Sequence, residues 1–99
     1  MAALRVAAQV VTRDFERIRE HLQAHQAERI EERLASIFEA LSIPRSHPSI
    51  GRLAADGCRE LVIGEGAHGY VARYRHDRVE DAVEVLAVRA QRERGSRTD

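Results

Sequence analysis

Residues 59–88 read RELVIGEGAHGYVARYRHDRVEDAVEVLAV, and this stretch decides the fold. Three runs within it are rich in β-branched and aromatic residues, as β-strands are: 59–63, 70–75 and 81–88. The turns between these runs are short. Short turns join antiparallel neighbours, whereas parallel strands need a long crossover. The stretch therefore predicts a three-stranded antiparallel meander.

A short strand and an amphipathic helix are predicted at the start of the chain. Residues 4–11 are rich in valine and alanine, which is typical of a short strand. The helix is predicted over residues 13–25, with Thr12 as its N-cap. Its apolar stripe recurs at spacings of 3 and 4 residues: Phe15, Ile18 and Leu22.

A second helix is predicted to begin near Gln26 and to end at Pro44. Its apolar stripe contains the following residues: Ala27, Ile30, Leu34, Ile37, Phe38 and Leu41. The gap between the two helices is short, so we expect them to form an antiparallel hairpin.

The order strand, helix, helix, strand, strand, strand predicts an α+β fold in which the helical hairpin covers one face of the sheet. At 99 residues we expect one domain over 1–99, with an ordered core over about 4–94 and a flexible tail over 95–99. The expected core residues come from both layers: Ile18, Leu22, Ile30, Leu34, Ile37, Leu61, Ile63, Val85 and part of 83–88.

Charge and composition exclude several classes of protein. The chain has 16 arginines, no lysine and 16 acidic residues, so its formal net charge is zero. Proteins that bind nucleic acid through its phosphates are normally basic, so direct nucleic-acid binding is not expected. Only residues 89–97 are skewed, with four arginines against one glutamate. No apolar run approaches 18 residues, which predicts a cytoplasmic protein without a membrane span.

The sequence predicts neither a metal nor a cofactor. Cys58 is the only cysteine, so an intramolecular disulfide and a cysteine-based zinc site are excluded, and a buried thiol is expected. His21 and His25 have the spacing of a zinc-binding pair on a helix, but the sequence suggests no third ligand. We therefore expect two exposed histidines near a helix end.

Residues 64–71 match the pattern G-x-G-x-x-G-x-V found in phosphate-covering loops of kinases, and in part the dinucleotide-binding fingerprint. The fingerprint needs a helix after the glycines, whereas a strand is predicted here. A kinase needs a lysine for the phosphates and a far longer chain. The pattern is therefore interpreted as a glycine-rich hairpin turn.

Arginines and tyrosines follow the predicted strands. Tyr70 and Tyr74 share one face of their strand, offset from Arg73 and Arg75. Such a surface could bind RNA, a protein partner or an acidic peptide. The alternative is an exposed sheet face whose arginines pair locally with acidic residues: Glu60, Glu65 and Glu84.

Taken in order, these segments resemble the RelE/ParE toxin superfamily. The resemblance runs from Leu4 to Arg94 and lies in the order and spacing of five stretches: 14–18, 43–52, 59–63, 70–75 and 85–93. It implies the fold derived above. It also implies a bacterial toxin of a type II toxin–antitoxin module, often called a plasmid stabilisation protein, neutralised by an antitoxin that wraps around it.

Two branches of the superfamily differ in how they act. RelE-like members cleave mRNA on the ribosome, whereas ParE-like members inhibit DNA gyrase without RNase chemistry. In the nucleases an arginine follows the aromatic residue that opens the middle strand, and the matching residue here is Val71. Many relatives have histidine where this chain has Ala90. The resemblance is therefore closer to ParE and favours a toxin that is not an enzyme.

We expect a ParE-like toxin that binds and inhibits a protein target, DNA gyrase. Two alternatives stay open: a RelE-like ribosome-dependent mRNA endonuclease, and a non-toxic remnant that only binds the antitoxin. A nuclease would use some of these residues: Arg73, Tyr74, Arg89 and Arg92. Partner binding is expected of the following arginines: Arg59, Arg73, Arg75, Arg89 and Arg92. The partners are the antitoxin and the target, and a homodimer or a hetero-oligomer with the antitoxin is left open.

Overall fold

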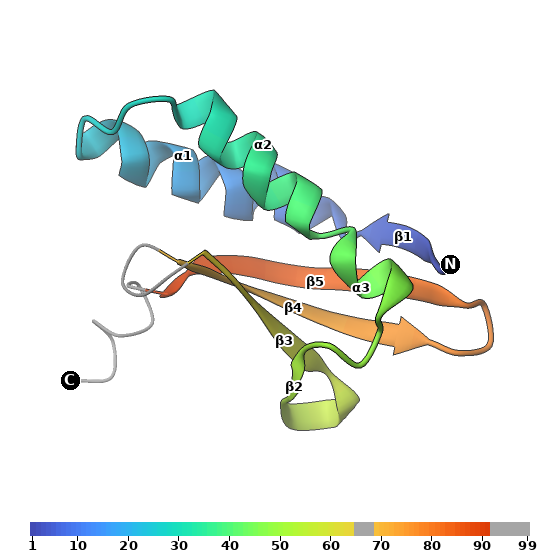
Figure 1. The fold of residues 1–99 in the computed structure, drawn as a ribbon. Helices are drawn as coiled ribbons and strands as arrows, with labels where there is room; N and C mark the ends of the chain where they lie inside the picture. Colours follow the sequence, from blue (N-terminus) through green and yellow to red (C-terminus); the bar gives the residue numbers. More distant parts are fainter. Residues whose placement is uncertain (65–68, 92–99) are drawn as a thin grey trace.

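A computed structural model describes residues 1–64 and 69–91 and shows an α+β fold with helices over one face of a sheet (Figure 1). The N-terminal part contains β1 (Ala3–Val6), the π-helical turn η1 (Val10–Asp14), α1 (Phe15–Ala24), α2 (Ile30–Ala40) and α3 (Ile43–Ser46). The C-terminal part contains β2 (Arg52–Leu53), the 3₁₀ turn η2 (Ala55–Gly57), β3 (Arg59–Ile63), β4 (Tyr70–Asp77) and β5 (Ala82–Ala90). The predicted tail over 95–99 lies outside the described residues.

The five strands form one sheet in the order β1-β5-β4-β3-β2. The predicted meander is confirmed, because β3 pairs antiparallel with β4 and β4 pairs antiparallel with β5. The N-terminal strand β1 joins β5 in parallel, with Leu4 opposite Val83. The two-residue strand β2, which was not predicted, pairs with β3 at the other edge.

The predicted strand over 4–11 is wrong beyond Val6. From residue 8 the chain is helical, and η1 runs directly into α1. Thr12 is therefore not an N-cap: it lies within the helical run, and its hydroxyl donates to the carbonyl oxygen of Ala8 at 3.1 Å. Val10 is completely buried in the core, which explains why packing overrides the strand propensity of the valines.

The second helix begins at Ile30, four residues later than predicted. Gln26 and Arg29 have φ values of 53° and 56°, a left-handed conformation that a continuing helix cannot contain. The helices still form the predicted hairpin, side by side over the sheet (Figure 1). Pro44 does not end this helix, because α2 stops at Ala40 and Pro44 lies in the first turn of α3.

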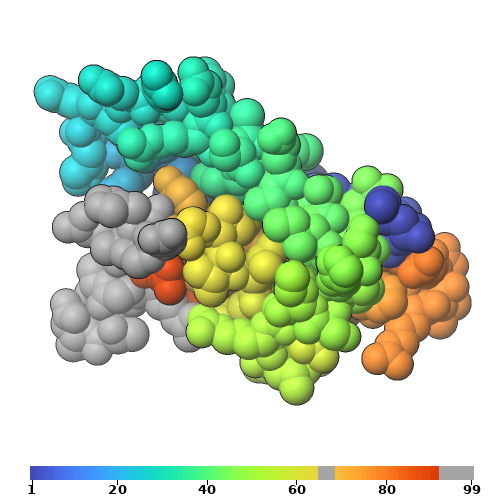
Figure 2. Space-filling view, viewed as in Figure 1, coloured from blue at the N-terminus to red at the C-terminus, as the bar shows by residue number. Residues whose placement is uncertain are grey.

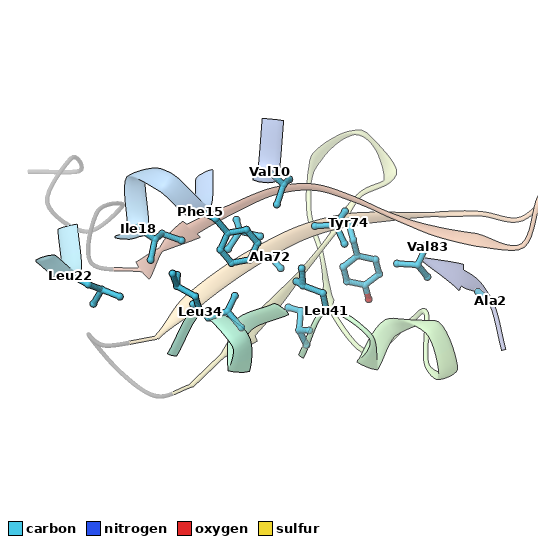
Figure 3. Packing of buried hydrophobic residues seen from close by; sticks show 14 residues of the cluster. Ala2, Val10, Phe15, Ile18, Leu22, Leu34, Leu41, Ala72, Tyr74 and Val83 are labelled. Atoms are coloured by element: carbon cyan, nitrogen blue, oxygen red, sulfur yellow. The ribbon is translucent and has the colours of Figure 1, made fainter. Parts of the chain in front are cut away.

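The core lies between the helical layer and the sheet, where side chains from both layers meet (Figure 3). The predicted core is confirmed for the following residues: Ile18, Leu22, Leu34, Ile37, Leu61, Val83, Val85 and Val88. Ile30 and Ile63 pack against it but are only partly buried. Leu41, from the predicted apolar stripe of the second helix, is completely buried too, whereas sequence reasoning did not place the completely buried Tyr74 in the core.

Asp14, the one buried charged residue in the described part of the chain, ties the helical layer to β5. Its Oδ2 accepts a hydrogen bond from the N–H of Val88 at 2.9 Å. Arg17 donates to the carbonyl oxygen of Val88 at 3.1 Å and to Asp14 Oδ1 at 3.2 Å. The two side chains thereby bind the backbone of β5 beyond the end of β1, where a neighbouring strand would otherwise bind it.

Shortening Leu34 should destabilise the whole domain. Leu34 is 7% exposed, so Leu34→Ala should lower the free energy of unfolding by about 2–5 kcal/mol through lost burial and a residual cavity. Urea unfolding followed by circular dichroism measures the change. Glu32→Ala, at an exposed position of the same helix, is the control and should change stability by less than about 0.5 kcal/mol. Equal effects of the two variants would contradict this packing.

Candidate functional site

The alternation of β4 divides the predicted site residues between the two faces of the sheet. Ala72 and Tyr74 belong to the core under the helices, and Tyr70 packs against it. Arg73 and Arg75 therefore lie on the opposite face, which we call the outer face. A register shift between Arg73 and Tyr74 falls on the pairing with β5 and leaves the pairing of β4 with β3 regular.

Three arginines surround one carboxylate on the outer face. Glu60 of β3 accepts a hydrogen bond from Arg52 at its Oε1 and from Arg89 at its Oε2, each at 3.3 Å. Arg73 is the cross-strand partner of Glu60 on β4. The side chain of Glu60 is only 14% exposed, so this carboxylate is largely buried beside the guanidinium groups. We call these four residues the arginine cluster.

A cavity of about 480 Å³ opens beside the arginine cluster. It is lined by Arg52, Leu53, Ala54, Ala55, Glu60 and Arg73, and we call it the arginine pocket. Arg73 has a distant ion pair with Asp56, 3.9 Å from Nη2 to Oδ2, and the Asp56 side chain is 90% exposed. The Nε of Arg73 is buried and has no hydrogen-bond partner among the residues that the structure describes. The pocket therefore has a guanidinium with unused donors in its wall.

The other arginines of the outer face are paired locally. Arg75 donates to Glu84 at 2.6 Å, and this hydrogen bond, together with the charge of Glu84, raises the pKa of Arg75. Arg5 on β1 lies 3.7 Å from Asp77 and 3.5 Å from Glu80. At the end of the sheet that contains Arg5 and Arg75, the arginines therefore pair locally with acidic residues, as the alternative interpretation of the sequence expected.

Arg59 and Tyr74 act on the loop that precedes β2. The Tyr74 hydroxyl is fully buried, donates to the carbonyl oxygen of Pro48 at 2.7 Å and accepts from the N–H of Gly51 at 2.9 Å. Arg59 donates to the carbonyl oxygen of Gly51 at 2.8 Å. A Cβ on residue 51 would lie 2.8 Å from the Tyr74 ring, so only glycine fits there. Both side chains are engaged in holding this loop.

The structure thus brings together two of the five arginines predicted to bind partners, Arg73 and Arg89. Arg75 lies on the same face with its own partner, Arg59 faces the loop, and Arg92 lies outside the described residues. Sequence reasoning named Glu60 only as a possible ion-pair partner and missed Arg52. The pairing of Ile63 with Tyr70 across the hairpin sets Glu60 opposite Arg73. Counting back from the predicted turn in this register could have identified Glu60 and Arg73 as neighbours.

A second hollow lies on the helical side of β3. It has a volume of about 480 Å³ and lies between α2 and the facing ends of β3 and β4, and we call it the α2–β3 pocket. Its lining residues are Arg33, Ser36, Ile37, Ile63, Gly64 and Tyr70. Burial raises the pKa of the Tyr70 hydroxyl, while the positive charge of Arg33 opposes this shift.

The outer edge of β3 is unpaired next to this pocket. In the described part of the chain β2 pairs only with Arg59 and Glu60, so residues 61–63 have no strand partner on this edge. Val62 is 42% exposed. In Figure 2 this segment lies at the surface between α2 and the β2–η2 segment. Free backbone groups beside an apolar hollow suit a partner's extended segment.

Other predicted features have simple placements. His21 and His25 are exposed, with ring centroids 4.3 Å apart, and Cys58 is buried. Within residues 1–64 and 69–91, no group of three metal-ligating side chains comes together, and no helix is long and apolar enough to cross a membrane. The glycine-rich pattern continues into a strand, as expected, but residues 65–68 of its turn lie outside the described part.

Comparison with protein families identifies the family of this chain. Residues 7–95 match the family model described as the ParE toxin of the type II toxin–antitoxin system, parDE. A search of curated proteins finds no match. The matched region contains both helices of the hairpin and the whole meander, and it confirms the resemblance to the RelE/ParE superfamily, on its ParE side. The chain therefore belongs to the family of ParE toxins of type II toxin–antitoxin systems.

Proposed function

We propose that this toxin acts by binding and inhibiting a protein target, DNA gyrase, and that it performs no RNA chemistry of its own. The observation that carries the proposal is the position of Glu60 between Arg52 and Arg89. A nuclease would need these cations to hold phosphate groups. A carboxylate at the centre of the cluster opposes phosphate binding and leaves a surface suited to protein partners.

The side chains available for RNA cleavage also support a binding function. Attack by a 2′-hydroxyl needs a base and a group that protonates the leaving oxygen. The Tyr74 hydroxyl is buried and engaged with two backbone groups, and arginines are poor bases because they stay protonated. Val71, where the nucleases have an arginine, is 0% exposed, and Ala90, where many relatives have histidine, is 8% exposed.

The antitoxin is the partner that follows from family membership, and we place its main contact at the α2–β3 pocket and the free edge of β3. The partly buried Ile63 and Tyr70 offer apolar surface above the buried Ile37, and Arg33 lies in the same wall. An extended antitoxin segment with apolar residues and a nearby acidic residue fits this surface. The proposal includes a single domain over residues 1–99 and a cytoplasmic location, where gyrase acts.

Expression of the toxin without its antitoxin tests the proposal. We expect replication to stop while mRNA stays intact, as measured by DNA synthesis and by primer extension on a ribosome-bound message. Deletion of residues 92–99 should abolish toxicity, because it removes most of the local excess of positive charge over 89–97. Codon-positioned cuts that disappear in Arg73→Ala would identify a nuclease. Antitoxin binding without any growth defect would identify a non-toxic remnant. Either result would refute the proposal.

Tyr74→Phe separates a structural from a catalytic hydroxyl. The variant leaves the Pro48 carbonyl and the Gly51 N–H without their partner, so the free energy of unfolding should fall by about 1–3 kcal/mol. Toxicity per folded molecule should remain. Tyr70→Phe is the matched control, because the Tyr70 hydroxyl has no hydrogen bond in the described part of the chain. Unchanged stability combined with a loss of toxicity by orders of magnitude would contradict the binding account.

A further inference from the structure

We propose that the arginine pocket receives one carboxylate of the antitoxin, an aspartate or glutamate side chain bound by Arg73. The inference rests on the proposed docking of the antitoxin beside β3. It adds a second, polar contact on the outer face, separate from the α2–β3 pocket. Its evidence lies in the unused donors of Arg73, the charge balance of the cluster and the position of the pocket at the edge of the sheet.

Arg73 has donors that its own chain does not use. Its ion pair in the described part of the chain is with the exposed Asp56, at 3.9 Å, beyond hydrogen-bond distance. Its Nε is buried and has no acceptor in the described part of the chain, so an incoming group does not reach this atom directly. The Arg73 side chain as a whole is 37% exposed, so the Nη end of the guanidinium is the part that a carboxylate can reach. The two Nη groups can donate together to the two oxygens of a carboxylate. An incoming carboxylate therefore gains hydrogen bonds from donors that the described residues leave unused.

Glu60 holds the rest of the cluster in place. Its two oxygens accept from Arg52 and Arg89, which fixes both guanidinium groups beside the pocket. Glu60 and Asp56 supply two negative charges against the three positive charges of Arg52, Arg73 and Arg89. Among the described residues, the site therefore has an excess of one positive charge, which matches one carboxylate.

The surroundings favour a protein carboxylate over RNA. A phosphate backbone brings many charges, and Glu60 and Asp56 would repel those beyond the first. Arg75 and Arg5, farther along the outer face, already have acidic partners. The rim of the pocket contains Leu53, which is 73% exposed, with Ala54 and Ala55. Apolar side chains around one cationic donor are typical of a pocket for a peptide residue.

The two pockets can be reached by one extended segment. The arginine pocket lies at Glu60, the α2–β3 pocket lies at Ile63, and the unpaired edge of β3 runs between them. A strand advances about 3.3 Å per residue, so about four residues cover this distance. We expect the antitoxin segment to have an acidic residue at one end of this stretch and an apolar residue at the other.

The test is the affinity of the full-length toxin for its antitoxin, measured by titration calorimetry. Arg73→Gln should weaken binding by about 10–100-fold, as expected for lost hydrogen bonds to a charged group. Arg73→Lys keeps the charge but lacks the planar guanidinium, so its affinity for the antitoxin should lie between those of the wild type and Arg73→Gln. Arg5→Gln, on the same face, is the control and should bind as wild type. Thermal unfolding confirms that each variant is folded.

Three results would overturn the inference. The first is wild-type affinity in Arg73→Gln. The second is an equal loss of affinity in Arg5→Gln, which would indicate only a general effect of charge. The third is a change in the electrophoretic mobility of single-stranded RNA when the wild-type toxin is added, but not when Arg73→Gln is added. This result would indicate that the pocket binds phosphate. Gyrase inhibition by the wild-type chain is measured separately, so a failure of the proposed target is distinguishable from a failure of this site.

Discussion

The hydroxyl of Tyr74 fixes the passage of the chain from the helical layer into the sheet. It donates to the carbonyl oxygen of Pro48 and accepts from the N–H of Gly51, and it lies so close to residue 51 that only glycine fits there. Arg59 donates to the carbonyl oxygen of Gly51 in the same loop. Strand β2 follows immediately and brings Arg52 to Glu60. A buried hydroxyl on the inner side of the sheet thus determines the shape of a charged pocket on its outer side. Because neighbouring side chains of a strand point to opposite faces, β4 places Tyr74 under the loop on the inner face and Arg73 in the pocket on the outer face.

The elements that could be predicted from sequence are those whose signal repeats over several residues. The meander and the two apolar stripes have clear periods, and the structure confirms them. The errors lie where one residue or a distant contact decides the conformation. Left-handed Gln26 and Arg29 shift the start of α2, and burial of Val10 turns a valine-rich strand into a helical turn. Strand β2, with two residues, is too short to have a period at all.

The candidate site was harder to predict because alternation tells which residues share a face but not which face is buried. Arg73 and Arg89 were both expected to bind partners, and the structure places both near Glu60, the carboxylate that lies between Arg89 and Arg52. Tyr74, a candidate for catalysis from its type and position, points into the core. The difference matters for function: the same residue types could form a nuclease site, but here one hydroxyl is buried and the cations surround a glutamate.

The arginines that the structure describes on the outer face are largely paired with acidic residues of the same chain, which is why we propose that this toxin acts through protein contacts. The most direct measurement is the supercoiling of plasmid DNA by purified gyrase with the purified full-length toxin, in the absence of ribosomes and mRNA. The account predicts that supercoiling decreases as toxin is added and recovers when the antitoxin is added in equal amount. Full supercoiling at every toxin concentration, from a toxin that stops growth when it is expressed, would contradict it.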